Sequence, residues 1–74
     1  MDFLEKIVIE LDELKGKIAR LTNKIEETLK RHRDEEWTKE ENEEYEMLRL
    51  QKNAMQLYSF ILKKRIEFYS NQRK

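Results

Sequence analysis

Residues 4–28 have the sequence LEKIVIELDELKGKIARLTNKIEET, in which apolar residues recur at alternating gaps of three and four. The recurring positions are Leu4, Ile7, Leu11, Leu14, Ile18, Leu21, Ile25 and, as the last member, Thr28. In an α-helix this spacing places all eight side chains on one narrow stripe, as in the seam of a coiled coil. The pattern therefore predicts one long helix that packs against another helix.

The expected ends of this first helix carry recognisable signals. Asp2 followed by Glu5 has the spacing of a capping box, which satisfies free N–H groups at a helix start. Lys30 and Arg31 place positive charge near the negative end of the helix dipole. We expect the first helix to run from about residue 3 to about residue 32.

A single long rod is not expected, because the seam does not continue. In the same register it would meet seven polar residues in succession, namely His32, Glu35, Lys39, Asn42, Glu46, Arg49 and Asn53. The apolar spacing resumes at Leu48 in a different register, and Thr38 with Glu41 forms a second capping-box pattern. We expect a turn at about residues 33–37 and a second helix from about residue 39 to about residue 71.

The charge pattern decides how the two helices pair. The net charge is −4 over residues 1–14, +5 over 15–33, −7 over 34–46 and +6 over 47–74. Only an antiparallel hairpin places blocks of opposite sign side by side. In this register the expected facing pairs are Leu11 with Tyr58, Leu14 with Met55, Leu21 with Leu48 and Ile25 with Tyr45. The sequence thus predicts an all-α, antiparallel two-helix hairpin.

The second helix is apolar over more of its surface than one neighbour can cover. One stripe contains Leu48, Met55, Leu62 and Tyr69, and the other contains Met47, Leu50, Ala54, Leu57, Ile61 and Phe68. Together they cover roughly 200° of the helix, about twice the arc that a one-sided helix needs. Two helices alone also bury little apolar surface against the entropy of ordering the chain. We expect a homo-oligomeric helical bundle, with a two-fold dimer as its commonest form and the second stripe as its interface.

The composition excludes most kinds of catalytic chemistry. The 74 residues include no cysteine, no proline, one glycine and one histidine, so no thiol nucleophile, phosphate-binding glycine loop or histidine pair can form. We therefore expect no enzyme, no cofactor and no metal site. The longest uncharged run, residues 53–62, is too short to span a membrane, and the chain starts without a signal-peptide pattern. We expect a cytoplasmic protein that does not bind membranes.

Three polar residues recur at heptad spacing along the middle of the broad apolar face: Gln51, Tyr58 and Arg65. One interpretation is that they fix the register and the number of subunits, as polar residues in bundle cores do. The other is that they line a pocket between subunits, in which Arg65 binds an anion and Tyr58 stacks on a ring. Arg20 and Lys24 are further candidate ligand-binding residues under the second interpretation.

Two segments resemble a known family. Residues 10–21, ELDELKGKIARL, and the pattern L-Q-x-x-A-M-x-x-Y-x-x-I-L-x-x-R-I over residues 50–66 are similar to those of very small phage and prophage hairpin proteins. The resemblance implies no enzymatic activity. It also implies an architecture similar to that of phage hairpin proteins which oligomerise and sequester cyclic nucleotides made by bacterial immune systems. We carry over no binding residue from those proteins, because the N-terminal segment that helps to build their pocket has no expected counterpart here.

Three functions remain open from the sequence. The resemblance favours a phage counter-defence protein that sequesters a host nucleotide-derived immune signal. A second possibility is an inhibitor or adaptor that binds a host protein through Trp37, the acidic block or the outer helix faces. A third is an RNA-binding hairpin dimer that uses the basic clusters at residues 30–33 and 63–65, with an affinity that falls steeply with salt.

Overall fold

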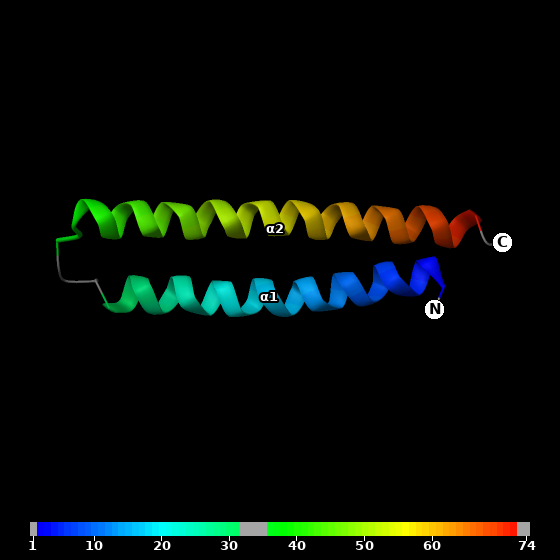
Figure 1. Ribbon diagram of the computed structural model, residues 1–74, viewed down its shortest axis with the longest axis horizontal. Helices are drawn as coiled ribbons and strands as arrows, with labels where there is room; N and C mark the ends of the chain where they lie inside the picture. Colours follow the sequence, from blue (N-terminus) through cyan, green and yellow to red (C-terminus); the bar gives the residue numbers. More distant parts are fainter. Residues whose placement is uncertain (1, 32–35, 73–74) are drawn as a thin grey trace.

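The computed structural model describes residues 2–31 and 36–72 as an antiparallel hairpin of two helices, α1 (Phe3–Arg31) and α2 (Lys39–Gln72) (Figure 1). The expected all-α hairpin is confirmed over the described residues, which contain no strand. Residues 33–35 of the expected turn, and His32 before it, lie outside the described part of the chain. The hairpin is a rod with extents of 57 × 15 × 15 Å.

Both helices begin at the predicted caps. The Asp2 side chain accepts a hydrogen bond from the backbone N–H of Leu4 at 3.2 Å. At α2 the N–H of Thr38 donates to the Glu41 carboxylate at 2.9 Å, while the N–H of Glu41 donates to the Thr38 hydroxyl at 3.1 Å. This reciprocal pair is the capping box predicted from the sequence, and it satisfies two N–H groups that the helix itself leaves free.

The stripe predicted on α1 is the surface that α1 turns towards α2. Its buried members are Ile7, Leu11, Leu14, Leu21 and Ile25, and its half-buried members are Leu4, Ile18 and Thr28. All eight positions of the heptad pattern are therefore covered at least in part, because one stripe of one helix faces one neighbour.

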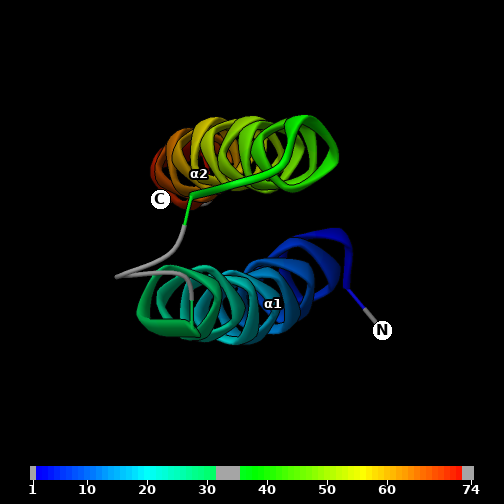
Figure 2. The same cartoon turned by 90° about the vertical axis from the view of Figure 1, so that its left-hand side faces the viewer.

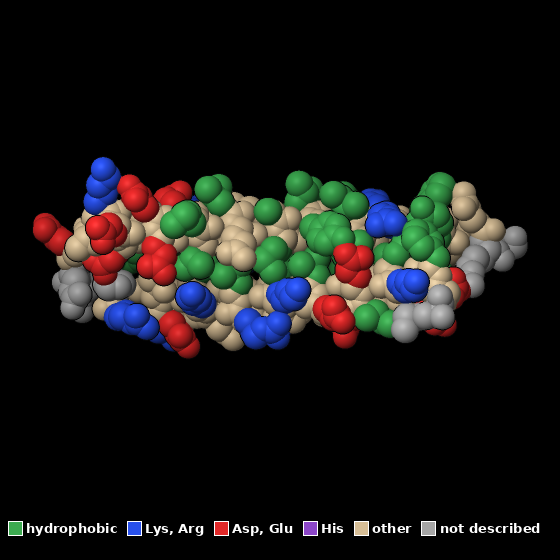
Figure 3. All heavy atoms as spheres, in the orientation of Figure 1, with side chains coloured by type: hydrophobic (Ala, Val, Ile, Leu, Met, Phe, Trp, Pro, Cys, Tyr) green, Lys and Arg blue, Asp and Glu red, His purple; other side chains and the backbone are tan. Residues whose placement is uncertain are grey.

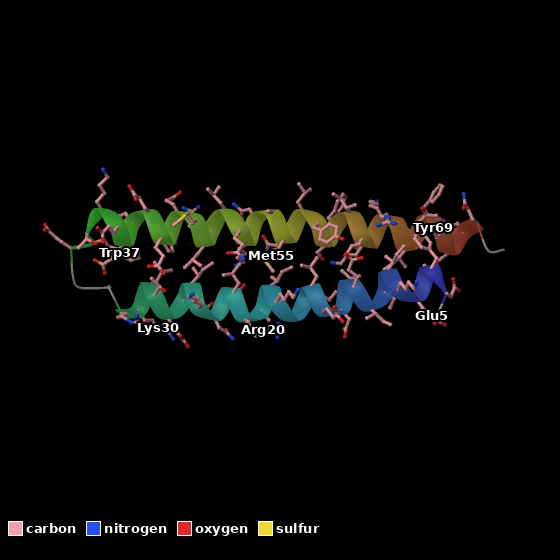
Figure 4. The ribbon with its side chains drawn as sticks, in the orientation of Figure 1. Glu5, Arg20, Lys30, Trp37, Met55 and Tyr69 are labelled. Atoms are coloured by element: carbon pink, nitrogen blue, oxygen red, sulfur yellow. The ribbon has the colours of Figure 1, made fainter. Side chains whose placement is uncertain are left out.

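On α2, one of the two predicted stripes supplies the matching surface. Leu62 is fully buried, with 0% of its surface exposed, and it packs in one cluster with Ile7, Leu11 and Leu14. Met55 packs against the same cluster and lies between the two helices (Figure 4). We call the α2 residues on this side the inner seam; they are Leu48, Met55, Ser59, Leu62, Ile66 and Tyr69.

Contacts along the rod fix the register. At the open end the rings of Phe3 and Tyr69 meet edge to face, with their centres 5.0 Å apart. At the loop end Trp37 meets Tyr45 in the same way at 5.2 Å. Tyr58 lies at the expected level beside residues 10 and 11, but the buried α2 position there is Ser59, with 7% of its surface exposed. The tyrosine projects from the edge of the interface because the buried face of α2 passes through residues 55, 59 and 62, and position 58 lies to one side of that line.

Viewed from the loop end, the two helices form a single layer (Figure 2). Each described helix therefore contacts the rest of the described chain along one side only. Neither α1 nor α2 contains a stretch that is both long enough and apolar enough to cross a membrane.

Candidate functional site

The side of α2 that is turned away from α1 carries a second apolar seam. We call it the outer seam; it consists of Met47, Leu50, Ala54, Leu57, Ile61 and Phe68. Met47, Leu50 and Leu57 have 63%, 63% and 61% of their surfaces exposed. Hydrophobic side chains line this edge of the rod (Figure 3). At 3.5 residues per turn the outer seam lies about 150° around the helix from the inner seam, so α1 cannot reach it.

The three polar candidates lie between the two seams of α2. We call Gln51, Tyr58 and Arg65 the ridge. Gln51 and Tyr58 are exposed, and Arg65 is half-buried. The Tyr58 hydroxyl donates a hydrogen bond to the Glu10 carboxylate, and the Arg65 guanidinium lies 5.7 Å from the centre of the Phe3 ring. The ridge therefore runs along the edge where α1 and α2 meet, and all three of its residues share one side of the hairpin.

The surroundings of Tyr58 favour the protonated phenol. The hydrogen bond to Glu10 is the largest cause of a raised pKa at Tyr58, and loss of water and the negative charge of Glu10 act in the same direction. The positive charge of Arg65 opposes them by lowering the pKa. The ridge thus presents a neutral ring with an acceptor on one side and a cation one heptad away.

The remaining two candidate ligand-binding residues, Arg20 and Lys24, do not lie near Arg65 in the hairpin. In the observed register Arg20 lies beside residue 49 of α2 and Lys24 lies beside residue 45. A rise of 1.5 Å per residue separates them from Arg65 by about 24 and about 30 Å along the rod. Figure 4 shows Arg20 about midway along α1. The five candidate residues therefore do not line one pocket within a single chain.

A polar groove on the opposite flank was not predicted. It has a volume of about 220 Å³ and is lined by Ile25, Tyr45, Arg49, Lys52, Asn53 and Gln56. The Arg49 guanidinium lies 5.8 Å from the centre of the Tyr45 ring and 3.3 Å from Glu46. The sequence signal for this groove is the spacing of Tyr45, Arg49 and Gln56, which places these three residues on one face of α2. A single shallow groove in which Arg49 is already paired offers a weaker anion site than the half-buried Arg65.

Trp37 packs at the loop end of the rod. It is half-buried against Tyr45, and with Leu29, Glu36 and Asn42 these two rings line a hollow of about 370 Å³. In this position Trp37 covers the loop end of the hairpin. The groups that precede it in the first basic cluster, His32 and Arg33, lie outside the described residues.

Two further features of the described residues bear on the candidate site: the space around Gly16 and the arrangement of possible metal ligands. A methyl group added to Gly16 would meet only the Arg20 guanidinium, at the ordinary contact distance of 3.5 Å. Over residues 2–31 and 36–72, no three histidine or carboxylate side chains come together in a way that could hold a metal ion.

These features define a small all-α hairpin protein whose reactive groups are cations, carboxylates, amides and aromatic rings displayed on a thin rod. The chain belongs to the Sequestin family, whose family model matches residues 1–68. The name of that family suggests a sequestering protein, one that binds rather than catalyses. No curated protein and no solved structure matches the chain. The family match agrees with the expectation of a small family of sequestering proteins.

Proposed function

We propose that this protein is a non-enzymatic phage counter-defence protein that assembles as a homo-oligomer and sequesters a host nucleotide-derived immune signal in the bacterial cytoplasm. The match to the Sequestin family carries this proposal, because it covers α1 and α2 as far as Phe68 and so includes the whole ridge. The ridge is the part of the hairpin whose side chains best suit a nucleotide.

Each residue of the ridge suits a different part of a nucleotide. The planar guanidinium of Arg65 can hold a phosphate through two parallel hydrogen bonds, and its contact with Phe3 keeps it in place. The exposed ring of Tyr58 offers a face for a base, and the Gln51 amide can both donate to and accept from a base edge. Because the Glu10 carboxylate lies beside Tyr58, we expect the phosphate at Arg65 rather than at Tyr58.

The two other functions open from the sequence gain less from the geometry. Trp37 packs on Tyr45 instead of projecting as an anchor for a host protein. In the second basic cluster the Lys64 ammonium lies 3.8 Å from Glu67, which weakens any continuous positive surface for RNA. If the folded chain binds no nucleotide, binding to a host protein or to RNA becomes the favoured function.

Calorimetric titration with cyclic mono-, di- and trinucleotides tests the proposal. We expect at least one of these ligands to bind the unmodified protein, and Arg65→Ala to weaken that binding at least tenfold. Lys63→Ala is the matched control, because Lys63 is an exposed cation two residues away and outside the ridge. Binding that is equal in the two variants, or absent for every ligand while circular dichroism shows folded helices, would contradict the proposal.

A further inference from the structure

The outer seam has the spacing of a helix–helix contact, yet the described chain leaves it uncovered. Met47, Leu50, Ala54, Leu57 and Ile61 follow the alternating gaps of three and four that define such a contact. The accessible surface is 6080 Å², whereas a globular monomer of 9.2 kDa exposes about 4,900 Å². The excess, on the order of 1,000 Å², is comparable to what one partner buries in a stable protein–protein interface.

The charges on α2 indicate what covers this seam. Residues 39–46 carry five carboxylates and one ammonium group, whereas residues 47–72 carry five cations and one carboxylate. Two copies of α2 side by side therefore repel if they are parallel and attract if they are antiparallel. A second copy also brings an equally long apolar seam, and a two-fold axis lets one seam cover the other completely.

We propose that the outer seam of α2 binds the outer seam of a second copy in antiparallel orientation, with the two-fold axis at the level between Ala54 and Leu57. In this register Leu50 packs on the partner's Ile61, and Ala54 packs on the partner's Leu57. The four central residues of the seam thereby cover one another, and next to the axis the small Ala54 lies opposite the large Leu57.

The polar break in the seam fits the same register. Lys64 stands where the heptad would have another apolar residue, and it comes to lie over the partner's Met47. Its four-carbon stem can cover that side chain while the ammonium group reaches solvent and the partner's Glu43. A shift of one heptad towards the C-terminus would place Lys64 opposite the partner's Ala54 and remove the nearby carboxylates.

The pairing has a consequence for the ridge, and this step rests on the proposed function. A two-fold rotation leaves both ridges on the same side of the dimer. Gln51 and Tyr58 of one copy then lie beside the partner's Tyr58 and the partner's Gln51. The ligand is held by residues of two chains, which explains why the ridge of a single hairpin is an open edge and not a pocket.

Because the chain has no cysteine, single introduced cysteines can report the geometry. Ala54→Cys is a small change, and its sulfur lies close to its own copy across the proposed axis, so oxidation should give a covalent dimer. In Met47→Cys the two cysteines lie about 25 Å apart along the helices, so this variant should form no covalent dimer. A mixture of Met47→Cys and Lys64→Cys chains should cross-link. Val8→Cys, on the exposed side of α1, is the control for random collisions.

Two results would overturn the proposed pairing. Self-cross-linking of both Ala54→Cys and Met47→Cys would indicate a parallel pair, and equal yields from Ala54→Cys and Val8→Cys would indicate that this seam is not an interface. Analytical ultracentrifugation adds a second measurement: Leu57→Glu should halve the mass of the assembly or unfold it, whereas Ile9→Glu should not. A correctly cross-linked Ala54→Cys dimer that binds no cyclic nucleotide would contradict the proposed ligand and leave the pairing intact.

Discussion

The hydroxyl of Tyr58 donates a hydrogen bond to the carboxylate of Glu10, which lies 48 residues earlier in the chain. One heptad further along α2, Arg65 lies against Phe3, one heptad before Glu10 on α1. The same edge of the hairpin is thus fixed at two levels by polar and aromatic contacts. These contacts hold the ridge in register with α1 and leave the outer seam free.

The first prediction concerns the ionisation of Tyr58. Because the bond to Glu10 and the charge of Glu10 raise the pKa of this phenol, it should lose its proton at a higher pH than an unfolded tyrosine, whose pKa is about 10. Absorbance at 295 nm during alkaline titration follows this event, and Tyr58→Phe identifies the component. Glu10→Gln should move the component to lower pH; an unchanged component would show that Glu10 is not the cause.

The same shift has a consequence for stability. The folded state favours the neutral phenol, so the stabilisation from this bond is complete below the pKa of an unfolded tyrosine and is lost as the pH rises through the folded pKa. The difference in unfolding temperature between the unmodified protein and Glu10→Gln should therefore shrink above about pH 10. A difference that grows with pH would mean that the folded state favours the ionised phenol instead.

The second prediction concerns the core. Leu62 is fully buried among Ile7, Leu11 and Leu14, so Leu62→Ala should remove about 2–5 kcal/mol from the free energy of unfolding. Val8→Ala, at an exposed apolar site on α1, should remove less than about 1 kcal/mol. Urea denaturation at equal protein concentration measures both. Equal losses would mean that the helices do not pack through the inner seam.

The sequence was sufficient for the fold because each of its local signals agreed with the others. The α1 stripe, the Thr38–Glu41 capping box and the alternating charge blocks each favoured the same hairpin, and the structure confirms it. The antiparallel register also predicted that the stripe with Leu48 and Met55 faces α1 and that the stripe with Leu57 does not. The burial of Leu62 and the exposure of Leu57 agree with this assignment.

The third prediction concerns the start of α2. Thr38→Ala removes the hydroxyl that accepts the Glu41 N–H, and it should lower the free energy of unfolding by about 1 kcal/mol. Thr28→Ala is the matched control. The Thr28 hydroxyl bonds the carbonyl of Lys24 within α1, so its loss should cost less than about 0.5 kcal/mol, since alanine favours the helix. A larger loss from Thr28→Ala would contradict the role given to the cap.

The fourth prediction concerns Gly16, which lies in the middle of α1 without a positive φ. An added methyl group meets only the flexible end of Arg20, so Gly16→Ala should raise the free energy of unfolding by about 0.5–1 kcal/mol. Thermal unfolding measures the change. If stability rises but ligand binding or assembly is lost, Gly16 serves the close approach of another molecule.

The candidate site was less accessible to sequence reasoning than the fold. Heptad spacing places Gln51, Tyr58 and Arg65 on one side of α2, because neighbours at this spacing share a helix face. It did not reveal the partner of Tyr58 on α1, since a polar pair across an edge leaves no periodic signal. Arg20 and Lys24 carry the positive charge that a phosphate requires, but their distance along the rod from Arg65 follows only from the register.

Sequestration of a nucleotide by an oligomer of hairpins can be tested in one experiment, native mass spectrometry of the protein purified from bacteria whose immune signalling is active. We expect an even-numbered assembly of 9.2 kDa chains that carries a nucleotide-sized mass, and we expect this mass to be absent from Arg65→Ala. A folded monomer, or an assembly without bound nucleotide from those same cells, would contradict the proposed function.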